Sequence, residues 1–169
     1  MITGAFHEDG LADMADGFGA GGSPEKINEI MHDSRLGTYG TSALTLGLLI
    51  RIGITIALVD LGYSMLIILA ISFASGKLAI LFIRNFSYPS NFAKTGTIIE
   101  YISFKKILLA TIIWSISVVF IFPFFSILLG IFLASVVVLI MIKLSNRKLG
   151  GITGDILGAT AFLTELAFM

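Results

Sequence analysis

The stretch ILLATIIWSISVVFIFPFFSILLGIFLASVVVLIMI, residues 107–142, contains no charged side chain and decides the class of fold. As a single α-helix it would be about 54 Å long, whereas the hydrocarbon core of a bilayer is about 30 Å thick. One membrane-spanning helix therefore does not fit this stretch. The sequence predicts a tight hairpin of two membrane helices instead, with the turn in FPFF around Pro123.

The rest of the chain extends the same pattern. Of its 169 residues, 56% are hydrophobic and 13% are charged, whereas soluble domains have about 45 to 50% apolar and about 25% charged residues. We expect membrane segments at 41–59 and 62–83, and a short one at 156–169. The predicted fold is an all-α, polytopic helical bundle in the lipid bilayer. It is a single integral membrane domain, residues 1–169, with an acidic helical motif region at 1–40 followed by about five membrane segments at 41–169.

The loops carry a topological signal. Two crossings separate residues 1–40 from the loop at 84–106, and two more separate that loop from 143–155, so all three regions are expected on one side. The loops at 84–106 and 143–155 contain seven basic residues: Arg84, Lys94, Lys105, Lys106, Lys143, Arg147 and Lys148. The opposite turns, at 60–62 and near 123, contain none. By the positive-inside rule, the shared side faces the cytoplasm and the protein is a multi-pass protein of the cell membrane.

Two features of the composition exclude classes of chemistry. The chain has no cysteine, so it forms no disulfide, thiolate nucleophile or cysteine-ligated zinc site. Its formal net charge is zero, and this balance gives no indication of a nucleic-acid partner. Hard cations bound through oxygen atoms remain possible.

The acidic stretch HEDGLADMADGFGAGG, residues 7–22, is the most informative polar segment. Asp9, Asp13 and Asp16 have the spacing i, i+4 and i+7, which places them on one stripe of a helix. Carboxylates in this pattern favour a site for Mg²⁺ or Mn²⁺, although a solvated acidic helix face is the alternative. Glu8 points off the stripe, and His7 is either a ligand or proton donor, or a side chain that packs or hydrogen-bonds locally.

A second helix is expected from Pro24 to about Ser34, with Ser23 as its N-cap. The segment DSRLGTYG, which starts at Asp33, then has two interpretations. In one, Arg35 binds a phosphate and Asp33 joins the metal cluster. In the other, Asp33 and Arg35 form a local ion pair that closes a loop.

The segment LGGITGDILGA, residues 149–159, is similar in style near the other end of the chain. Asp155 follows three glycines there and is a further candidate site residue. Gly158 is interpreted as a packing position between helices.

Three ionisable residues lie within or near predicted membrane segments: Arg51, Lys77 and Glu165. An ionisable group in a membrane segment is costly and is a functional hypothesis by default. Arg51 is the strongest of the three because it has apolar neighbours on both sides, whereas Lys77 can extend its ammonium group towards the interface.

Three blocks together resemble adenosylcobinamide-GDP ribazoletransferase, the membrane-bound cobalamin synthase of prokaryotes: TGAFHEDGLADMADGFGAGG (3–22), EIMHDSRLGTYG (29–40) and GGITGDILGATAFLTEL (150–166). Between them, FAKTG at 92–96 is similar to a loop of the family. ASGK at 74–77 stands where the family usually has Ser-Arg, so that Lys77 would have to replace the arginine. Members of the family carry a further stretch with membrane helices before the first block. The resemblance therefore also suggests a truncated gene model, a fragment or a decayed copy.

The resemblance implies a reaction in the last step of cobalamin assembly. The cobinamide phosphate of adenosylcobinamide-GDP is transferred to α-ribazole, or to its 5′-phosphate, and GMP is released. Asp9, Asp13 and Asp16 would hold the metal, Mg²⁺ or alternatively Mn²⁺, which bridges the diphosphate. The two substrates and the lipid bilayer are then the partners, and a homo-oligomer is possible.

The resemblance also implies roles for residues outside the metal stripe. Arg35 and Lys94 would contact the substrate phosphates. Asp33 and Asp155 would be further metal ligands or a base, and Asp16 or Asp33 is preferred as the base. Asp16, Asp33 and Asp155 thus form the predicted catalytic set.

A cation transporter or channel subunit is the alternative from another class, with the acidic stripe as the ion site and Arg51 as an internal counter-charge. Transporters usually keep their binding charges near the bilayer midplane, whereas these acids precede the first predicted membrane segment. The sequence therefore favours an interfacial enzyme. An inactive fragment of the synthase is the third hypothesis.

Overall fold

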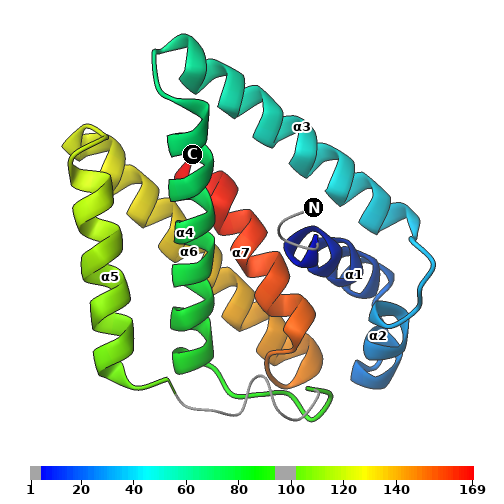
Figure 1. Ribbon diagram of the computed structural model, residues 1–169. Helices are drawn as coiled ribbons and strands as arrows, with labels where there is room; N and C mark the ends of the chain where they lie inside the picture. Colours follow the sequence, from blue (N-terminus) through cyan, green and yellow to red (C-terminus); the bar gives the residue numbers. More distant parts are fainter. Residues whose placement is uncertain (1–4, 94–101) are drawn as a thin grey trace.

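The structure, a computed structural model, describes residues 5–93 and 102–169 (Figure 1). Within these ranges the secondary structure is helical, apart from one isolated bridge between Pro89 and Ile152. The helices are α1 (Phe6–Ala20), α2 (Pro24–Met31), α3 (Thr38–Asp60), α4 (Met65–Phe86), α5 (Phe104–Val119), α6 (Phe124–Leu149) and α7 (Gly154–Phe168). The predicted all-α class is confirmed.

The apolar stretch at 107–142 forms the predicted hairpin. α5 ends at Val119, Pro123 is the N-cap of α6, and the turn between them lies in FPFF and the two residues before it. Proline suits this position because it has no backbone N–H to donate and its φ is restricted near −65°. Figure 1 shows α5 and α6 joined at one end of the molecule and diverging from there, with α5 beside α4.

Three helices in the described parts of the chain are long and apolar enough to cross a membrane, namely α3, α4 and α6. The prediction of about five segments also counted α5 and α7, which have 16 and 15 residues. A perpendicular crossing takes about 20 residues. The helical bundle is therefore as predicted. In the described residues, fewer helices than the predicted five segments are long and apolar enough to span a membrane.

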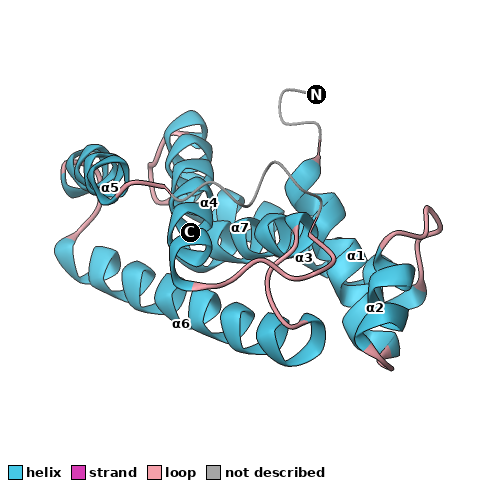
Figure 2. Ribbon diagram, turned by 90° about the horizontal axis from the view of Figure 1, so that it is seen from below, coloured by secondary structure: helices cyan, strands magenta, loops and turns pink. Residues whose placement is uncertain are grey.

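α7 is the central helix, packed against α1, α4 and α6 (Figures 1 and 2). Its side chains Ile156, Ala159 and Phe162 are fully buried. In contrast, α3, α5 and α6 expose many large apolar side chains, such as Leu49, Ile113 and Phe132. This distribution suits a bundle whose outer helices face lipid and whose inner helix is surrounded by protein.

α1 and α7 approach each other closely at two glycines. A Cβ added to Gly10 would lie 2.5 Å from the carbonyl oxygen of Asp155, and one added to Gly158 would lie 2.7 Å from the carbonyl oxygen of Phe6. Both contacts are to backbone, so a side chain at either position would push the helices apart. The predicted packing role of Gly158 is confirmed, and α1 lies directly against the central helix.

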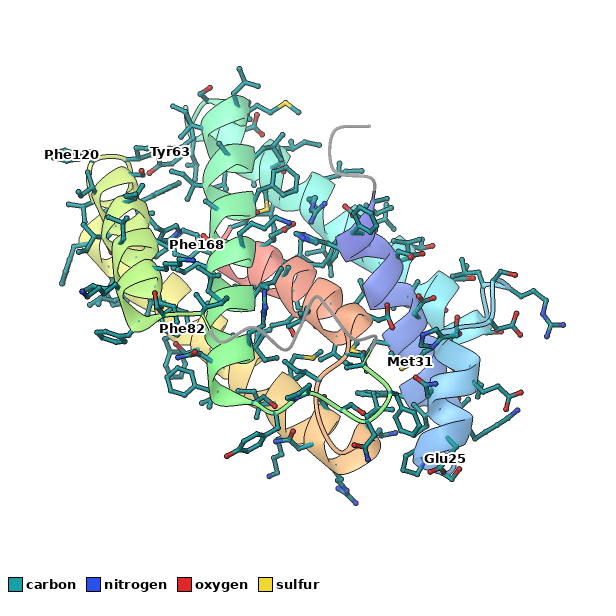
Figure 3. The ribbon with its side chains drawn as sticks, turned by 60° about the horizontal axis from the view of Figure 1, so that its bottom comes forward. Glu25, Met31, Tyr63, Phe82, Phe120 and Phe168 are labelled. Carbon is teal, nitrogen blue, oxygen red and sulfur yellow. The ribbon has the colours of Figure 1, made fainter. Side chains whose placement is uncertain are left out.

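Figure 1 shows where the ends of the helices lie along the bundle. The last turns of α4 and α6, the first turns of α5 and α7, and α2 lie at one end of the bundle, called here the loop end. The turns after α3 and α5 lie away from it, and Tyr63 and Phe122 from these two turns stack with ring centroids 5.2 Å apart. Figure 3 shows Tyr63 and Phe120 together at this opposite end.

Backbone hydrogen bonds connect segments at the loop end. The amide of Ser90 donates to the carbonyl of Ile152 (3.0 Å), and the amide of Ile152 donates to the carbonyl of Tyr88 (2.9 Å). Gly151, with φ of +158°, is required here because a Cβ would lie 2.6 Å from the Ser90 nitrogen. The segment after α4 is thereby joined to the turn that leads into α7.

Near the start of the chain, the predicted N-cap at Ser23 is confirmed, but the boundaries of α2 and α3 differ from the prediction. Ser23 caps α2 by accepting a hydrogen bond from the Lys26 amide at 3.3 Å. α2 ends at Met31, three residues before the predicted Ser34, and α3 begins at Thr38 rather than 41. Met31, the last residue of α2, packs against Gly17 of α1. Figure 3 shows Met31 between α1 and α2.

Candidate functional site

The predicted acidic stripe lies on α1. Asp9, Asp13 and Asp16 are all within Phe6–Ala20, as their spacing required. They differ in exposure, because Asp9 is exposed, Asp13 is partly buried and Asp16 is buried. The three carboxylates therefore have different surroundings despite their common helix.

Asp16 binds the first turn of α3. One carboxylate oxygen accepts a hydrogen bond from the amide of Gly37 (2.7 Å), and the other accepts one from the amide of Gly40 (2.8 Å). A negatively charged acceptor stabilises the amides that have no partner at the start of a helix. A Cβ at Gly37 or Gly40 would overlap the Asp16 carboxylate, which explains the two glycines in DSRLGTYG. Both oxygens of Asp16 thus contact α3, whereas the prediction assigned them to a metal.

Asp13 is surrounded by other carboxylates. Burial raises its pKa from 3.8 to about 6, and the negative charges of Asp9, Asp155 and Asp16 add to the shift, while His32 opposes it. The influence of Asp155 shows that the tertiary structure brings the first turn of α7 close to α1. Three of the predicted site residues, Asp9, Asp13 and Asp155, therefore lie in one negatively charged region, called here the acidic face.

Asp155 owes its position to the start of α7. Thr153 caps this helix by accepting a hydrogen bond from the Ile156 amide at 3.4 Å. Gly10 lets the carbonyl of Asp155 approach α1. The glycines and threonine of LGGITGD thus place an acid beside the acids of α1, which neither segment reveals by itself.

Asp33 and Arg35 bind each other on the surface. Arg35 donates from Nε to Oδ1 of Asp33 (3.0 Å) and from a terminal nitrogen to Oδ2 (2.7 Å). The hydrogen bonds from the Arg35 side chain and backbone lower the pKa of Asp33 to about 2. A carboxylate with such a low pKa is a poor general base. This geometry corresponds to the local loop-closing pair, and Lys94, the other predicted phosphate contact, lies outside the described residues.

The described residues form no group of three acidic, histidine or cysteine side chains that could hold a metal ion by itself. Mg²⁺, however, is commonly bound by one or two carboxylates together with substrate phosphates. The crowded carboxylates around Asp13 have the right donor chemistry for such a shared site, because a divalent cation would relieve their repulsion. The acidic face therefore fits a metal whose remaining ligands come from a diphosphate.

A second group of charges lies between the helices, with Glu165 and His7 buried, Glu8 and Arg51 partly buried and Lys77 exposed. We call it the buried network, and its members are His7, Glu8, Arg51, Lys77 and Glu165. They come from α1, α3, α4 and α7. The sequence identified Arg51, Lys77 and Glu165 as unusual in or near membrane segments. It placed Glu8 off the acidic stripe and left His7 as a ligand or proton donor, or a side chain that packs or hydrogen-bonds locally, without predicting their long-range partners.

The contacts of the buried network form a continuous chain. Lys77 Nζ lies 2.9 Å from His7 Nε2, and His7 Nδ1 lies 2.7 Å from Glu165 Oε1. Arg51 binds the other oxygen of Glu165 and also donates to Glu8 at 2.9 Å. Arg51 further packs over the ring of Phe162, with its guanidinium carbon 4.2 Å from the ring centroid. Each charge in this chain faces a partner of opposite sign or the imidazole ring.

Two apolar cavities lie away from the acidic face. One, of about 360 Å³, is between α3 and α4 and has Arg51 among its lining residues. The other, of about 270 Å³, lies between the end of α3, α6 and the end of α7. Neither is lined by an acidic residue of α1. The candidate site is therefore the acidic face of α1 and α7 and not either cavity.

The comparison with protein families gives one match along the full chain. The family is described as cobalamin-5-phosphate synthase, and the match covers residues 1–169. The chain belongs to this family. The resemblance seen in the three sequence blocks is thereby confirmed, and both the acidic stretch of α1 and the start of α7 lie within the matched region.

Curated relatives of the synthase family support the same assignment. A protein of Azorhizobium caulinodans named adenosylcobinamide-GDP ribazoletransferase is 35% identical over 174 residues, which cover 100% of this chain and 66% of the relative. Proteins with the same name from Clostridium botulinum (strain Okra / Type B1) and Vibrio cholerae (strain ATCC 39541) are each 38% identical. The match covers 100% and 98% of this chain, and 68% and 64% of these relatives. The chain thus spans about two thirds of their length, and no solved structure matches it significantly.

Proposed function

We propose that this chain carries the transfer chemistry named in its relatives, adenosylcobinamide-GDP ribazoletransferase. The observation that carries the proposal is the acidic face, where Asp9 and Asp13 of α1 meet Asp155 of α7. Two sequence blocks that identify the family, one near each end of the chain, thereby contribute to one site. Membership of the synthase family favours this function over a cation transporter.

In the proposed reaction, a ribose hydroxyl of α-ribazole, or of its 5′-phosphate, attacks the phosphorus that is linked to cobinamide. A new P–O bond forms, the bond to the bridging oxygen of the diphosphate breaks, and GMP leaves with that oxygen. The proton of the hydroxyl passes to a base. Asp16 and Asp33 suit this role poorly, since Asp16 is held by two amides and the pKa of Asp33 is lowered to about 2.

We propose Mg²⁺, with Mn²⁺ as the alternative, as the cofactor. When bound, the ion would neutralise negative charge on the diphosphate and on the leaving phosphate. Asp13, with one of its neighbours Asp9 and Asp155, would hold it, and the diphosphate would supply the remaining ligands. These carboxylates bring negative charge to a place where a diphosphate must also bind, and this supports the need for a cation.

We further propose that the loop end faces the cytoplasm. The described basic residues Arg84, Lys105, Lys106, Arg147 and Lys148 all lie in or beside the segments of this end. Short loops with an excess of lysine and arginine are typical of the cytoplasmic side. The substrates would then reach the acidic face from the cytoplasm, with the large apolar side chains of α3, α5 and α6 in lipid.

The test is GMP release from adenosylcobinamide-GDP and α-ribazole by membranes containing this chain, with Mg²⁺ and with EDTA. Release that depends on the metal and is lost in Asp13→Asn would support the proposal. A matched variant, Glu29→Gln, changes an exposed acid of α2 that pairs with Lys26 and should leave release unchanged. Release that survives in Asp13→Asn would overturn the assignment of the acidic face.

A further inference from the structure

The buried network joins four helices, and the proposed transfer chemistry does not use its side chains. We propose that this network positions the first half of α1, so that Asp9 and Asp13 face Asp155, and that Glu165 is its central positioning residue. The inference rests on the proposed function for its catalytic consequence. Its structural part, the placement of α1, is independent of that function.

The contacts determine where the protons are. A lysine ammonium group has only donors, so at 2.9 Å Lys77 donates to His7 Nε2, which must then be the acceptor nitrogen. The ring proton is therefore on Nδ1 and is donated to Glu165 Oε1 at 2.7 Å. With a neutral imidazole, the network contains two cations, Lys77 and Arg51, and two carboxylates, Glu8 and Glu165. Its charges therefore balance, with Glu165 fully buried and Lys77 at an exposed position.

Glu165 reaches α1 by two routes. It binds His7 directly, and it binds Arg51, which in turn donates to Glu8 at 2.9 Å. Glu165 is fully buried, so these partners compensate its charge in place of water. Gly76 of α4 makes room for it, because a Cβ there would lie 2.7 Å from Glu165 Oε1.

The first half of α1 is held by the buried side chain of Leu11, which lies in the apolar core with Phe162, and by these polar contacts. Its contact with α7 at Gly10 and Gly158 is between glycines and backbone atoms. No side chain interlocks there to fix the position of α1 along α7. Its N-cap, Ala5, makes no side-chain capping hydrogen bond. The second half has separate anchors, since Asp16 binds α3 and Lys148 Nζ donates to the Phe18 carbonyl at 2.7 Å. Asp9 and Asp13 lie between these two sets of anchors.

Spin-label distances test this placement without substrate or metal. The chain has no cysteine, so Phe6→Cys with Lys143→Cys introduces the only two attachment points. Phe6 lies on α1 with 76% of its surface exposed, and Lys143 is exposed on α6, which contributes nothing to the buried network. We expect one narrow distance distribution in the parent and a shifted or broadened one in Glu165→Gln.

Thr164→Val is the matched control. Thr164 neighbours Glu165 on α7 and is equally inaccessible, but its hydroxyl has no hydrogen-bond partner. This variant should keep the parent distance distribution. An unchanged distribution in Glu165→Gln, or an equal change in Thr164→Val, would overturn the inference.

Kinetics give a readout that general loss of stability does not produce. In folded Glu165→Gln, kcat for GMP release should fall about 10- to 100-fold, as for other residues that orient a metal site. KM should stay within about twofold of the parent, because the substrate contacts remain. If Glu165→Gln does not fold, Lys77→Met, at an exposed position of α4, is judged by the same distances. A parent that releases no GMP would end the proposed function, whereas the label distances would still decide the positioning role.

Discussion

The first half of α1 carries two groups of ionisable side chains that differ in their neighbours. In the buried network, His7 and Glu8 face Lys77, Arg51 and Glu165, and the charges balance. In the acidic face, burial raises the pKa of Asp13 to about 6, and the nearby negative charges of Asp9, Asp155 and Asp16 add to the shift. Within α1 the two groups are at most six residues apart in sequence, yet only in the buried network do the described contacts pair each carboxylate with a cation or with His7.

The difference indicates that one helix, α1, can contribute both to the stability of the fold and to a candidate site. A balanced set of buried charges favours one arrangement of helices, because moving any member leaves another without its partner. A crowded set of carboxylates costs stability and is retained where a ligand can use it. We therefore assign the network to the scaffold, and the acidic face is the site that we propose for a cation and a phosphate.

The largest effect on stability is expected from Glu165→Ala. Removing this carboxylate leaves Arg51 and His7 without their common partner inside the bundle. The free energy of unfolding should fall by about 3 to 5 kcal/mol, the range found when one partner of a buried ion pair is removed. Reversible unfolding in detergent micelles measures it, with Thr164→Val as the control. A loss close to that of the control would mean that the network contributes little to the scaffold.

Asp13→Asn should affect function and stability in opposite directions. GMP release should fall about 100-fold or more, since an essential charge at the transferring phosphate is lost. At pH values above 6, Asp13→Asn should be slightly more stable than the wild-type protein. The raised pKa of Asp13, about 6 against 3.8, means that its ionised form is unfavourable in the folded protein.

The pH dependence of this stabilisation has a definite sign. The wild-type protein gains stability from protonation of Asp13 as the pH falls from about 6 to 3.8, so the difference from Asp13→Asn should vanish below pH 4. Unfolding midpoints of the two proteins at pH 4 and pH 8 measure it. A variant that is less stable than the parent at pH 8 would show that Asp13 is compensated like the network.

Gly40→Ala tests the boundary between the two regions. The added methyl group would overlap the carboxylate of Asp16 and lie 2.8 Å from the carbonyl of Ala12. We expect a loss of about 1 to 3 kcal/mol, typical of an overpacked contact. Gly53→Ala, on the same helix with no atom within 4 Å of the added Cβ, should instead be neutral or stabilising by up to about 1 kcal/mol. Equal effects of the two substitutions would contradict the role of Asp16 as the anchor of α3.

Arg35→Ala should have the smallest effect on stability. Arg35 and Asp33 are exposed and bind only each other in the contacts described above. We expect an unchanged unfolding midpoint, because exposed ion pairs contribute little. A raised KM in GMP release would then support the predicted phosphate contact, and an unchanged KM would leave Arg35 with its loop-closing role alone.

Much of the fold could be predicted from local sequence. The hairpin at Pro123, the cap at Ser23 and the helix that carries Asp9, Asp13 and Asp16 all depend on residues within a few turns of one another. The site could be predicted only in part. The metal role of Asp16 stays a prediction. Its cap on α3 could not be predicted from local sequence, because its partners Gly37 and Gly40 are 21 and 24 residues away.

The sequence by itself determined a helical membrane protein of the synthase family with acids on one stripe, because hydropathy, helix period and motif order are properties of the chain. Only the tertiary structure decided which of its charges are compensated. His7 and Glu165 are 158 residues apart, and Arg51 and Glu165 are 114 apart. No local pattern encodes contacts at such separations, since they form when α1, α3 and α4 pack around α7.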